Sequence, residues 1–322
     1  MTSDNTPKKY TIGVDLGAQT AKIGIVDRYG QIIAQTVIPS NQTTSPHIFI
    51  GELAQAIQTL LEGHITKDEV VGIGVGAPAC NYFTGEIINA VNITWSSKKA
   101  IPFATWLSEA TGMPVHATND ANAAAMGEMA YGVAKGMKDF IMITLGTGVG
   151  SGIVANGQVI YGHDGFAGEL GHVIVERNGR PCTCGRQGCL QTYCSAMGVK
   201  TTALMMLNDS TAPSLLREVN PETLSSKDVF EAAEQGDEIA LEVFRYTGQK
   251  LGEAFADFVA FSAPEAIVLF GGLTKAREYI YPAIIEHMEK NLLTFWQGKV
   301  KVLFSAISES DAAILGASAL AW

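Results

Sequence analysis

The sequence lacks the features that mark several classes of protein. Only 5 of its 322 residues are cysteine and 17% are charged. No uninterrupted apolar run reaches the roughly 18 residues of a membrane span, and the sequence contains neither a fixed-period repeat nor a low-complexity tract. These absences exclude a secreted domain held together by disulfides, a helical membrane protein and a solenoid.

Basic side chains are also scarce. The 22 Lys and Arg are outnumbered by 32 Asp and Glu, which gives a formal net charge of −10, so we expect neither a nucleic-acid nor a membrane partner. The N-terminal stretch MTSDNTPKKY carries no apolar segment of signal-peptide length. Because clustered cysteines also fit a reducing compartment, we expect a cytoplasmic protein.

The remaining composition is that of a folded chain. A hydrophobic fraction of 47% supports a large core, and the length favours two domains. Short β-rich runs alternate with helical patterns, which predicts the α/β fold class. The expected elements are two strands around the Tyr29-Gly30 turn, a helix over residues 50–61, a strand over 70–79, a helix over 103–112, a strand and an Ala-rich helix opened by Asn119 and Asp120, two strands over 139–162, helices over 192–261, a strand over 265–272 and a capped helix over 308–322.

Three glycine-containing turns follow apolar strands. The first, GVDLGAQTAKIG, contains Asp15 and Gly17, and the second, TLGTGVGSG, repeats the strand-turn-strand design. Glycines there let backbone N–H groups approach a phosphate, and an aspartate beside them can hold Mg²⁺. A plain hairpin or a strand-to-helix turn is the alternative for each of them. The candidate ATP-binding residues are Asp15, Gly17, Gly146, Thr147, Gly148, Gly271 and Gly272, with Asp15 also the candidate magnesium ligand.

The segment TNDANAA places Asn119 and Asp120 at the start of a helix. Both residues are favoured there simply as N-caps. The functional alternative is that Asp120 accepts a proton from a substrate hydroxyl that attacks a γ-phosphoryl group, while Asn119 holds a neighbouring hydroxyl.

Three of the five cysteines lie within eight residues of one another, after a histidine. The spacing is His172-x9-Cys182-x-Cys184-x4-Cys189, and three thiolates with one imidazole form a closed tetrahedral Zn²⁺ site of the structural kind. A redox cluster and chance are the alternatives. Cys80 and Cys194 lie outside this set, and we expect them to be buried apolar filler.

The stretch GELGHVIVERNGRPCTCGRQGCLQTYCSA resembles the signature region of the ROK family of bacterial sugar kinases and sugar-responsive repressors. GVDLG, NDAN, LGTGVGSG and FGG occur in the order of that family, so the resemblance covers nearly the whole chain. It implies an actin-like (ribonuclease H-like), two-lobed kinase fold in which ATP lies between the DLG and GTGVG turns. The implied small lobe spans residues 1–120 and is completed by helix 308–322, and the large lobe spans 121–307.

The resemblance also implies roles for individual residues. Asp120 would be the catalytic general base, and zinc would fix the loop that presents its neighbours to the sugar. The implied cofactors are ATP, Mg²⁺ and structural Zn²⁺, and relatives are usually dimers or tetramers, so we expect a homodimer or homotetramer. The implied sugar-binding residues are Ala79, Asn119, Asp120, Glu169, His172 and Gln191.

This chain departs from the family pattern at three places. Gln191 stands in GCLQ where a sugar-contacting glutamate is usual, and an amide loses the charge-assisted acceptor while it adds donors. The first turn reads GAQTAK where Gly-Gly-Thr-Lys is usual, and Ala79 replaces a usual glycine in GAPA.

The expected reaction is the ATP-dependent phosphorylation of glucose to glucose 6-phosphate. Alternatives within the family are kinases for N-acetylmannosamine, N-acetylglucosamine, mannose or fructose. A sugar-sensing repressor carries a winged helix-turn-helix ahead of the DLG turn, whereas 14 residues precede Asp15 here, so we expect no repressor. A sugar-binding protein without catalytic activity stays open.

Overall fold

The computed structural model describes residues 8–90, 92–96 and 99–322. Within these residues the chain folds into two compact units. The first unit contains the described residues up to Met137, Gln158–Gly168 and Ser305–Trp322, and the second contains Lys138–Gly157 and Glu169–Phe304. The first unit therefore includes residues 121–137, 158–168 and 305–307, which the family resemblance assigns to the large lobe. The lobe boundaries themselves stay a prediction.

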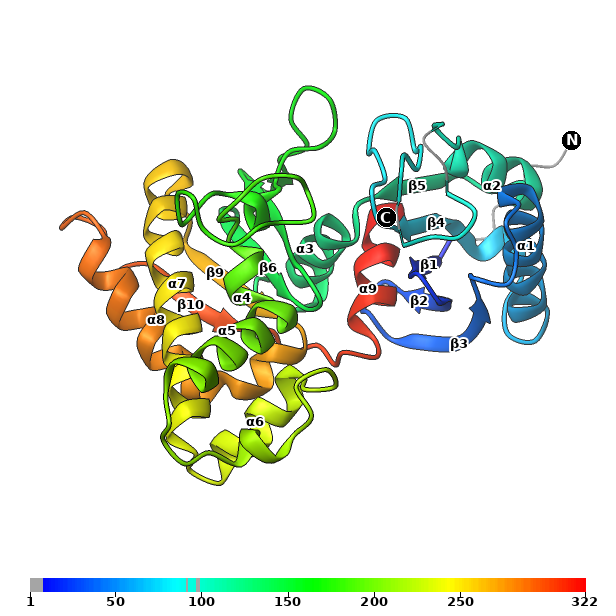
Figure 1. Cartoon of the computed structure of the whole chain (residues 1–322). Helices are drawn as coiled ribbons and strands as arrows, with labels where there is room; N and C mark the ends of the chain where they lie inside the picture. Colours follow the sequence, from blue (N-terminus) through cyan, green and yellow to red (C-terminus); the bar gives the residue numbers. More distant parts are fainter. Residues whose placement is uncertain (1–7, 91, 97–98) are drawn as a thin grey trace, which may run out of the picture. The chain divides into compact units, whose positions relative to one another are not determined.

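A five-stranded mixed sheet forms the centre of the first unit (Figure 1). Its strands are β1 (Tyr10–Leu16), β2 (Thr20–Asp27), β3 (Ile32–Pro39), β4 (Val70–Gly76) and β5 (Val115–Thr118). They lie in the order β3-β2-β1-β4-β5. The first three form an antiparallel meander, whereas β1, β4 and β5 run parallel to one another. The carboxyl ends of these three parallel strands consequently share one edge of the sheet.

Helices cover both faces of this sheet. They are α1 (Pro46–Glu62), α2 (Phe103–Thr111), α3 (Asp120–Tyr131) and α9 (Ala312–Ser318). Ser45 caps α1 by accepting a hydrogen bond from the Ile48 amide, and the helix ends at Gly63 as its periodicity predicts. Figure 1 shows α1 and α9 on opposite sides of the sheet, with α3 next to α9.

The C-terminal helix is shorter than the sequence predicts. Residues 308–311 form a hydrogen-bonded turn in which the Ser308 hydroxyl donates to the Asp311 carboxylate at 2.9 Å, and the α-helix begins only at Ala312. Asp311 makes no side-chain capping bond to this helix. The predicted capping pattern therefore orders the turn before the helix rather than its first turn.

Glycines in the sheet set how closely α9 can approach. A Cβ atom on Gly13 would collide with the carbonyl of Ile314, and one on Gly74 would collide with the carbonyl of Ala317. The helix backbone thus lies directly against β1 and β4, with no side-chain layer at these two points. This close packing fixes the C-terminal segment onto the centre of the sheet.

The second unit is built on a second mixed sheet. Its strands are β6 (Phe140–Leu145), β7 (Val149–Ala155), β9 (Ala266–Phe270) and β10 (Lys301–Phe304). The two-residue strand β8 (Gln158–Val159), which the division into units assigns to the first unit, completes the sheet order β10-β9-β6-β7-β8. β6 and β7 form an antiparallel hairpin, while β9 runs parallel to β6. A hairpin flanked by a parallel strand therefore occurs in both sheets, which confirms the two related units predicted from the sequence and the α/β class.

Five α-helices accompany this second sheet among the described residues. They are α4 (Gln191–Cys194), α5 (Ala196–Asp209), α6 (Ser226–Glu234), α7 (Glu238–Ser262) and α8 (Arg277–Asn291). The two polar stretches of this region, NDSTAPS and NPETLSSKD, both lie around the connection from α5 to α6, and residues 235–237 separate α6 from α7. Sequence patterns did not predict α8, which contains Pro282, or the short strand β10. No helix within the described residues combines the length and apolarity needed to cross a bilayer.

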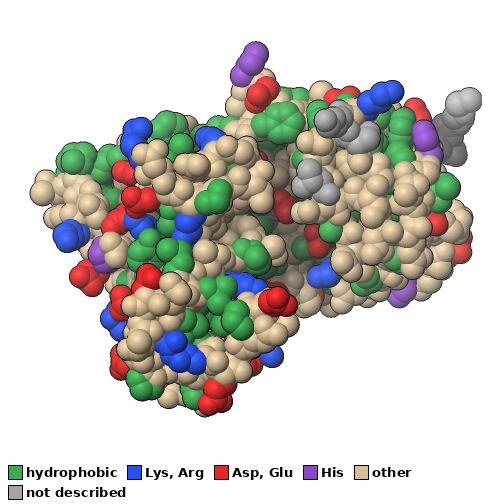
Figure 2. Space-filling model, in the orientation of Figure 1, with side chains coloured by type: hydrophobic (Ala, Val, Ile, Leu, Met, Phe, Trp, Pro, Cys, Tyr) green, Lys and Arg blue, Asp and Glu red, His purple; other side chains and the backbone are tan. Residues whose placement is uncertain are grey.

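Charged side chains are mixed over the face drawn in Figure 2. Basic groups are scattered among acidic ones there, and the described side chains of this face do not gather into one basic patch. The described side chains of this face therefore form no concentration of positive charge, as expected for a chain of negative net charge.

The packing of α9 can be tested by filling the space left by a glycine. We expect Gly74→Ala to destabilise the protein by about 3 kcal/mol, because the new Cβ meets a backbone carbonyl rather than a movable side chain. Thermal denaturation should show a fall of about 10 °C. The control is Gly51→Ala in α1, where a Cβ has no neighbour within 4 Å, and which should raise stability by about 0.5–1 kcal/mol. Equal melting temperatures for Gly74→Ala and wild type would contradict this packing.

Candidate functional site

The predicted site residues of the first unit gather at one edge of its sheet. Asp15 lies near the end of β1, with Gly17 in the turn that follows. Ala79 comes after β4, and Asn119 and Asp120 come directly after β5. Since these three strands are parallel and adjacent, the structure brings all five residues to the same edge, as α/β proteins do with ligand-binding residues.

The first glycine turn is a tight hairpin. The Gly17 amide donates to the Thr20 carbonyl at 3.0 Å, and Asp15 pairs with Lys22 across the two strands. Burial raises the pKa of Asp15 to about 6, with Lys22 acting against this rise and Asp120 adding to it. The charge of the predicted base therefore raises the pKa of the predicted magnesium ligand.

Asn119 and Asp120 both act at the start of α3. The Asn119 Oδ1 accepts a hydrogen bond from the Ala121 amide at 2.8 Å, which makes Asn119 the N-cap, and the Asp120 Oδ1 accepts from the same amide at 2.9 Å. Surrounding protein raises the pKa of Asp120, while the Ala121 hydrogen bond opposes this rise. The Asp120 side chain nevertheless reaches solvent, so water limits the energetic cost of its charge. A raised pKa suits a carboxylate that accepts a proton.

Ala79 adopts the backbone conformation of a glycine. Its φ is +52°, in the left-handed region that costs a residue with a Cβ about 1–2 kcal/mol. The family usually has glycine at this position, and the observed conformation supplies a physical reason for that preference. In this chain the strained alanine persists in a loop whose carbonyl at Ala79 accepts a hydrogen bond from the Ile88 amide at 3.1 Å.

The second and third glycine turns lie side by side in the second unit. The β6–β7 turn closes with a 3.0 Å bond from the Gly146 amide to the Gly148 carbonyl, and Thr147 is exposed at its tip. Gly271 follows the adjacent strand β9 with a φ of +105°. A Cβ there would lie 2.6 Å from the Leu145 carbonyl. The structure thus places the predicted phosphate turn and the Gly271-Gly272 pair at one edge of the second sheet.

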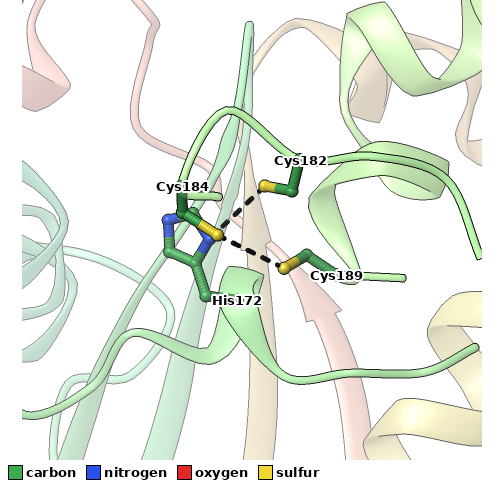
Figure 3. Close-up of side chains that lie close together, drawn as sticks. All are labelled: His172, Cys182, Cys184 and Cys189. Atoms are coloured by element: carbon green, nitrogen blue, oxygen red, sulfur yellow. Dashed lines mark hydrogen bonds between the residues drawn. The ribbon is translucent and has the colours of Figure 1, made fainter. Parts of the chain in front are cut away.

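The four predicted metal ligands converge on one point, as Figure 3 shows. Their ligand atoms all lie within 4.8 Å of one another. The Cys182 Sγ is 3.8 Å from the His172 Nδ1, and the Cys184 Sγ is 3.6 Å from the Cys189 Sγ. Ligand atoms bound to tetrahedral zinc through bonds of about 2.3 Å are about 3.8 Å apart. The donor set and its spacing therefore fit a zinc ion.

Glycines shape the loop that carries these ligands. Gly185 and Gly188 have φ values of +87° and +76°, so both occupy conformations that glycine adopts without strain. A Cβ on Gly188 would also collide with the Glu176 carbonyl. The segment before the loop is held equally closely, because a Cβ on Gly171 would collide with the Val149 carbonyl.

The thiols of this cluster differ in their affinity for protons. Burial opposes ionisation of Cys184, but hydrogen bonds from Arg186 and from the neighbouring thiols lower its pKa to about 6. Burial and the other thiols raise the pKa of Cys189 to about 12. A divalent cation would hold all three sulfurs as thiolates and so remove this difference.

The sequence analysis did not find a network of charged and aromatic side chains that contacts the metal loop. The Arg180 guanidinium lies 4.5 Å from the Tyr193 ring centroid and donates to the Thr192 carbonyl at 2.9 Å. Lys250 of α7 is buried and contacts Glu176 of the loop at 3.0 Å. The sequence contains one signal for this network, a lysine on the apolar face of a long helix, because a buried charge needs a partner.

The predicted sugar-binding residues are divided between the two units. Ala79, Asn119 and Asp120 belong to the first, whereas His172 and the exposed Glu169 belong to the second. The sixth residue, Gln191, also belongs to the second unit, and its amide nitrogen lies 3.2 Å from the Cys182 Sγ. Cys80 and Cys194 are buried and lie outside the metal cluster.

Comparison with known proteins relates nearly the whole chain to one family. A family model described as "ROK family" matches residues 11–322. The glucokinase of Halalkalibacterium halodurans is 39% identical over 87% of this chain and 86% of that protein. The regulator NagC of Escherichia coli, described as a DNA-binding transcriptional dual regulator, is 28% identical over 97% of this chain and 75% of the regulator.

A solved structure confirms the fold. The ROK family glucokinase from Streptomyces griseus, in complex with glucose and AMPPNP, superposes with a TM-score of 0.78 at 30% identity, over 96% of this chain and 98% of that one. The two mixed sheets with their helices are therefore those of the actin-like ROK sugar kinases that the motifs predict.

The raised pKa of Asp15 predicts a pH-dependent stability. Between the ordinary value of 3.8 and about 6 the folded chain binds more protons than the unfolded chain, so this residue lowers stability as pH rises through that range. We expect Asp15→Asn to stabilise the ligand-free protein at pH 7 by about 2 kcal/mol, after allowing for partial exposure, and to have no effect near pH 4. Melting temperatures across this range test the prediction, with the exposed Glu52→Gln as control. A gain that is the same at both pH values would contradict it.

The metal site predicts a difference between cysteines. We expect the purified protein to hold one zinc ion per chain and Cys189→Ser to lose it, because a closed site needs all four ligands. The matched control is Cys194→Ala, which removes a buried thiol outside the cluster and should retain the metal. Elemental analysis by mass spectrometry measures both. Equal zinc contents in Cys189→Ser and wild type would exclude this cluster as the site.

Proposed function

The chain belongs to the ROK family, and on that basis we propose that it is a kinase that transfers the γ-phosphoryl group of ATP to a hexose. Glucose is the proposed substrate and glucose 6-phosphate the proposed product. The observation that carries this proposal is the position of Asp120, which begins α3 at the carboxyl edge of three parallel strands and has a raised pKa. Two of the relatives described above are named glucokinases, and this supports glucose as the substrate.

In the proposed reaction Asp120 is the general base. Its carboxylate accepts the proton of the sugar 6-hydroxyl as that oxygen attacks the γ-phosphorus, and the bond from this phosphorus to the bridging oxygen breaks to release ADP. The transferred negative charge needs stabilisation while this occurs. Asp15 would hold Mg²⁺ for that purpose, and the Lys22 charge opposite it lowers the pKa of Asp15 and so favours the ionised carboxylate at neutral pH.

Backbone groups would provide most of the contacts to ATP. The Gly146–Gly148 turn would offer the N–H groups of Thr147 and Gly148, since the Gly146 amide already donates to the Gly148 carbonyl, and Thr147 at its exposed tip adds a hydroxyl. Gly271 and Gly272 lie beside this turn and would allow the nucleoside to approach the backbone closely. In the first unit Gly17 would leave space for a phosphate beside the backbone, while its own amide donates to the Thr20 carbonyl.

Candidate sugar contacts lie in each of the two units. In the first, Asn119 accepts the capping hydrogen bond through Oδ1, which directs its amide nitrogen away from the helix and toward a ligand. In the second, Glu169 and His172 flank the short turn that opens the metal loop. Zinc would act by fixing that loop, so its chemical contribution is structural rather than catalytic.

A regulator is the second candidate function, favoured by the similarity to NagC. Such a protein binds a sugar and does not phosphorylate it. The two candidates differ in turnover rather than in sugar binding. An assay that measures both properties therefore separates them, and a panel with N-acetylmannosamine, N-acetylglucosamine, mannose and fructose identifies the substrate.

The proposal is tested by ADP release with Mg-ATP and this sugar panel. We expect glucose to be turned over, and Asp120→Asn to lower kcat by about 10²–10⁴-fold because it removes the proton acceptor. Sugar binding, measured as the rise in melting temperature, should survive in the variant. The control is Glu109→Gln, an exposed carboxylate of α2, which should keep wild-type kcat.

The outcomes are distinct. Stabilisation by a sugar without any ADP release would favour the regulator. Full kcat in Asp120→Asn would remove Asp120 from the reaction whatever sugar is used.

A further inference from the structure

Gln191 contacts the metal cluster through its side-chain amide. It is the first residue of α4, two positions after the ligand Cys189, and its Nε2 donates a hydrogen bond to the Cys182 Sγ at 3.2 Å. The family usually has a glutamate here. A thiolate that ligates a metal accepts hydrogen bonds and donates none, so an amide nitrogen matches it, whereas a carboxylate would place one negative acceptor beside another.

The charge of the cluster gives this hydrogen bond a physical role. Three thiolates and one neutral imidazole around Zn²⁺ carry a net charge of −1, which partly resides on sulfur. An N–H group directed at a thiolate withdraws part of that charge and lowers the reactivity of the sulfur. Hydrogen bonds to ligand sulfurs tune metal centres in this way.

The other end of the same amide faces the predicted phosphate turn. A Cβ added to Gly148 would lie 3.1 Å from the Gln191 Oε1, so the glycine and the amide oxygen are already in close packing. Larger residues at position 148 would displace this side chain. Gln191 consequently touches both the metal cluster and the β6–β7 turn.

Backbone contacts join the same two regions on either side of Gln191. The Ala196 amide donates to the Gly146 carbonyl at 2.8 Å, and the Leu170 amide donates to the Ser151 hydroxyl at 2.9 Å. The turn, the start of α5 and the segment before His172 therefore pack as one body in the second unit. Within it, the Gln191 side chain lies between the metal ligand Cys182 and Gly148 of the turn.

We propose that Gln191 is a positioning residue, which holds the Cys182 thiolate with its N–H group and packs its carbonyl beside Gly148 of the phosphate turn, in place of the sugar contact usual in the family. The part that concerns the phosphate turn rests on the proposed kinase function. The part that concerns the thiolate does not, because it depends only on a metal bound by the cluster.

The thiolate contact is tested in protein loaded with Co²⁺ in place of zinc. We compare Gln191→Met, which keeps the length and lacks the donor, and Gln191→Glu with the matched control Gln187→Glu, an exposed residue of the same loop. Both substitutions at position 191 should shift the sulfur-to-cobalt charge-transfer band to lower energy and speed iodoacetamide alkylation of the bound thiolates by about 10-fold. The control should match wild type.

The d–d bands of tetrahedral cobalt show whether each variant retains a folded site. If those bands persist and neither the charge-transfer band nor the alkylation rate changes in Gln191→Met, the proposed hydrogen bond is excluded. A shift in Gln187→Glu as large as that in Gln191→Glu would also overturn the proposal, because it would show a general effect of charge.

Kinetics test the second contact. We expect the KM for ATP to rise by about 10-fold in Gln191→Met while the KM for the sugar changes by less than about 2-fold. The opposite pattern, with the sugar KM altered and the ATP KM unchanged, would make Gln191 a sugar ligand and overturn the proposal. If wild type turns over no sugar, the proposed kinase function fails, and the cobalt spectra still decide the thiolate contact.

Discussion

The arrangement of each sheet is the constraint on which the candidate site depends. In both sheets an antiparallel hairpin is flanked by a parallel strand, β4 beside β1 and β9 beside β6. Parallel neighbours bring their carboxyl ends to one edge, where the backbone turns away and side chains and amides become available to ligands. Asp15 and Asp120 meet at the first such edge, and the Gly146–Gly148 turn meets Gly271 at the second.

Glycine at close approaches determines what can lie against these edges. Gly13 and Gly74 let α9 rest directly on the first sheet, while Gly171 lets the segment that carries His172 rest on β7. In each case the partner is a backbone carbonyl, which cannot move aside as a side chain can. The segment that opens the metal loop is therefore attached by packing to β7, the strand that follows the phosphate turn.

The metal loop and its surroundings show how one substitution redistributes a polar network. With Gln191 in place of the usual glutamate, an amide donor faces the Cys182 thiolate and an amide oxygen faces Gly148. Two cationic side chains also contact this region. Buried Lys250 pairs with Glu176, and the Arg180 guanidinium lies over the Tyr193 ring. Several contacts therefore stabilise the loop. The replacement of the usual glutamate by Gln191 alters one contact within this region of the second unit.

The sequence by itself determined the fold class, the duplicated hairpins, the capped start of α3 and the set of four metal ligands, because local periodicity and ligand spacing are written in contiguous residues. It did not predict α8, whose pattern Pro282 interrupts, or β10, or the late start of α9 at Ala312. Only the tertiary structure decided that Gln191 contacts Cys182, that Lys250 meets Glu176, and that Asp120 lies close enough to raise the pKa of Asp15. These contacts join residues whose distance in space is set by the packing of whole elements, so no local pattern could reveal them.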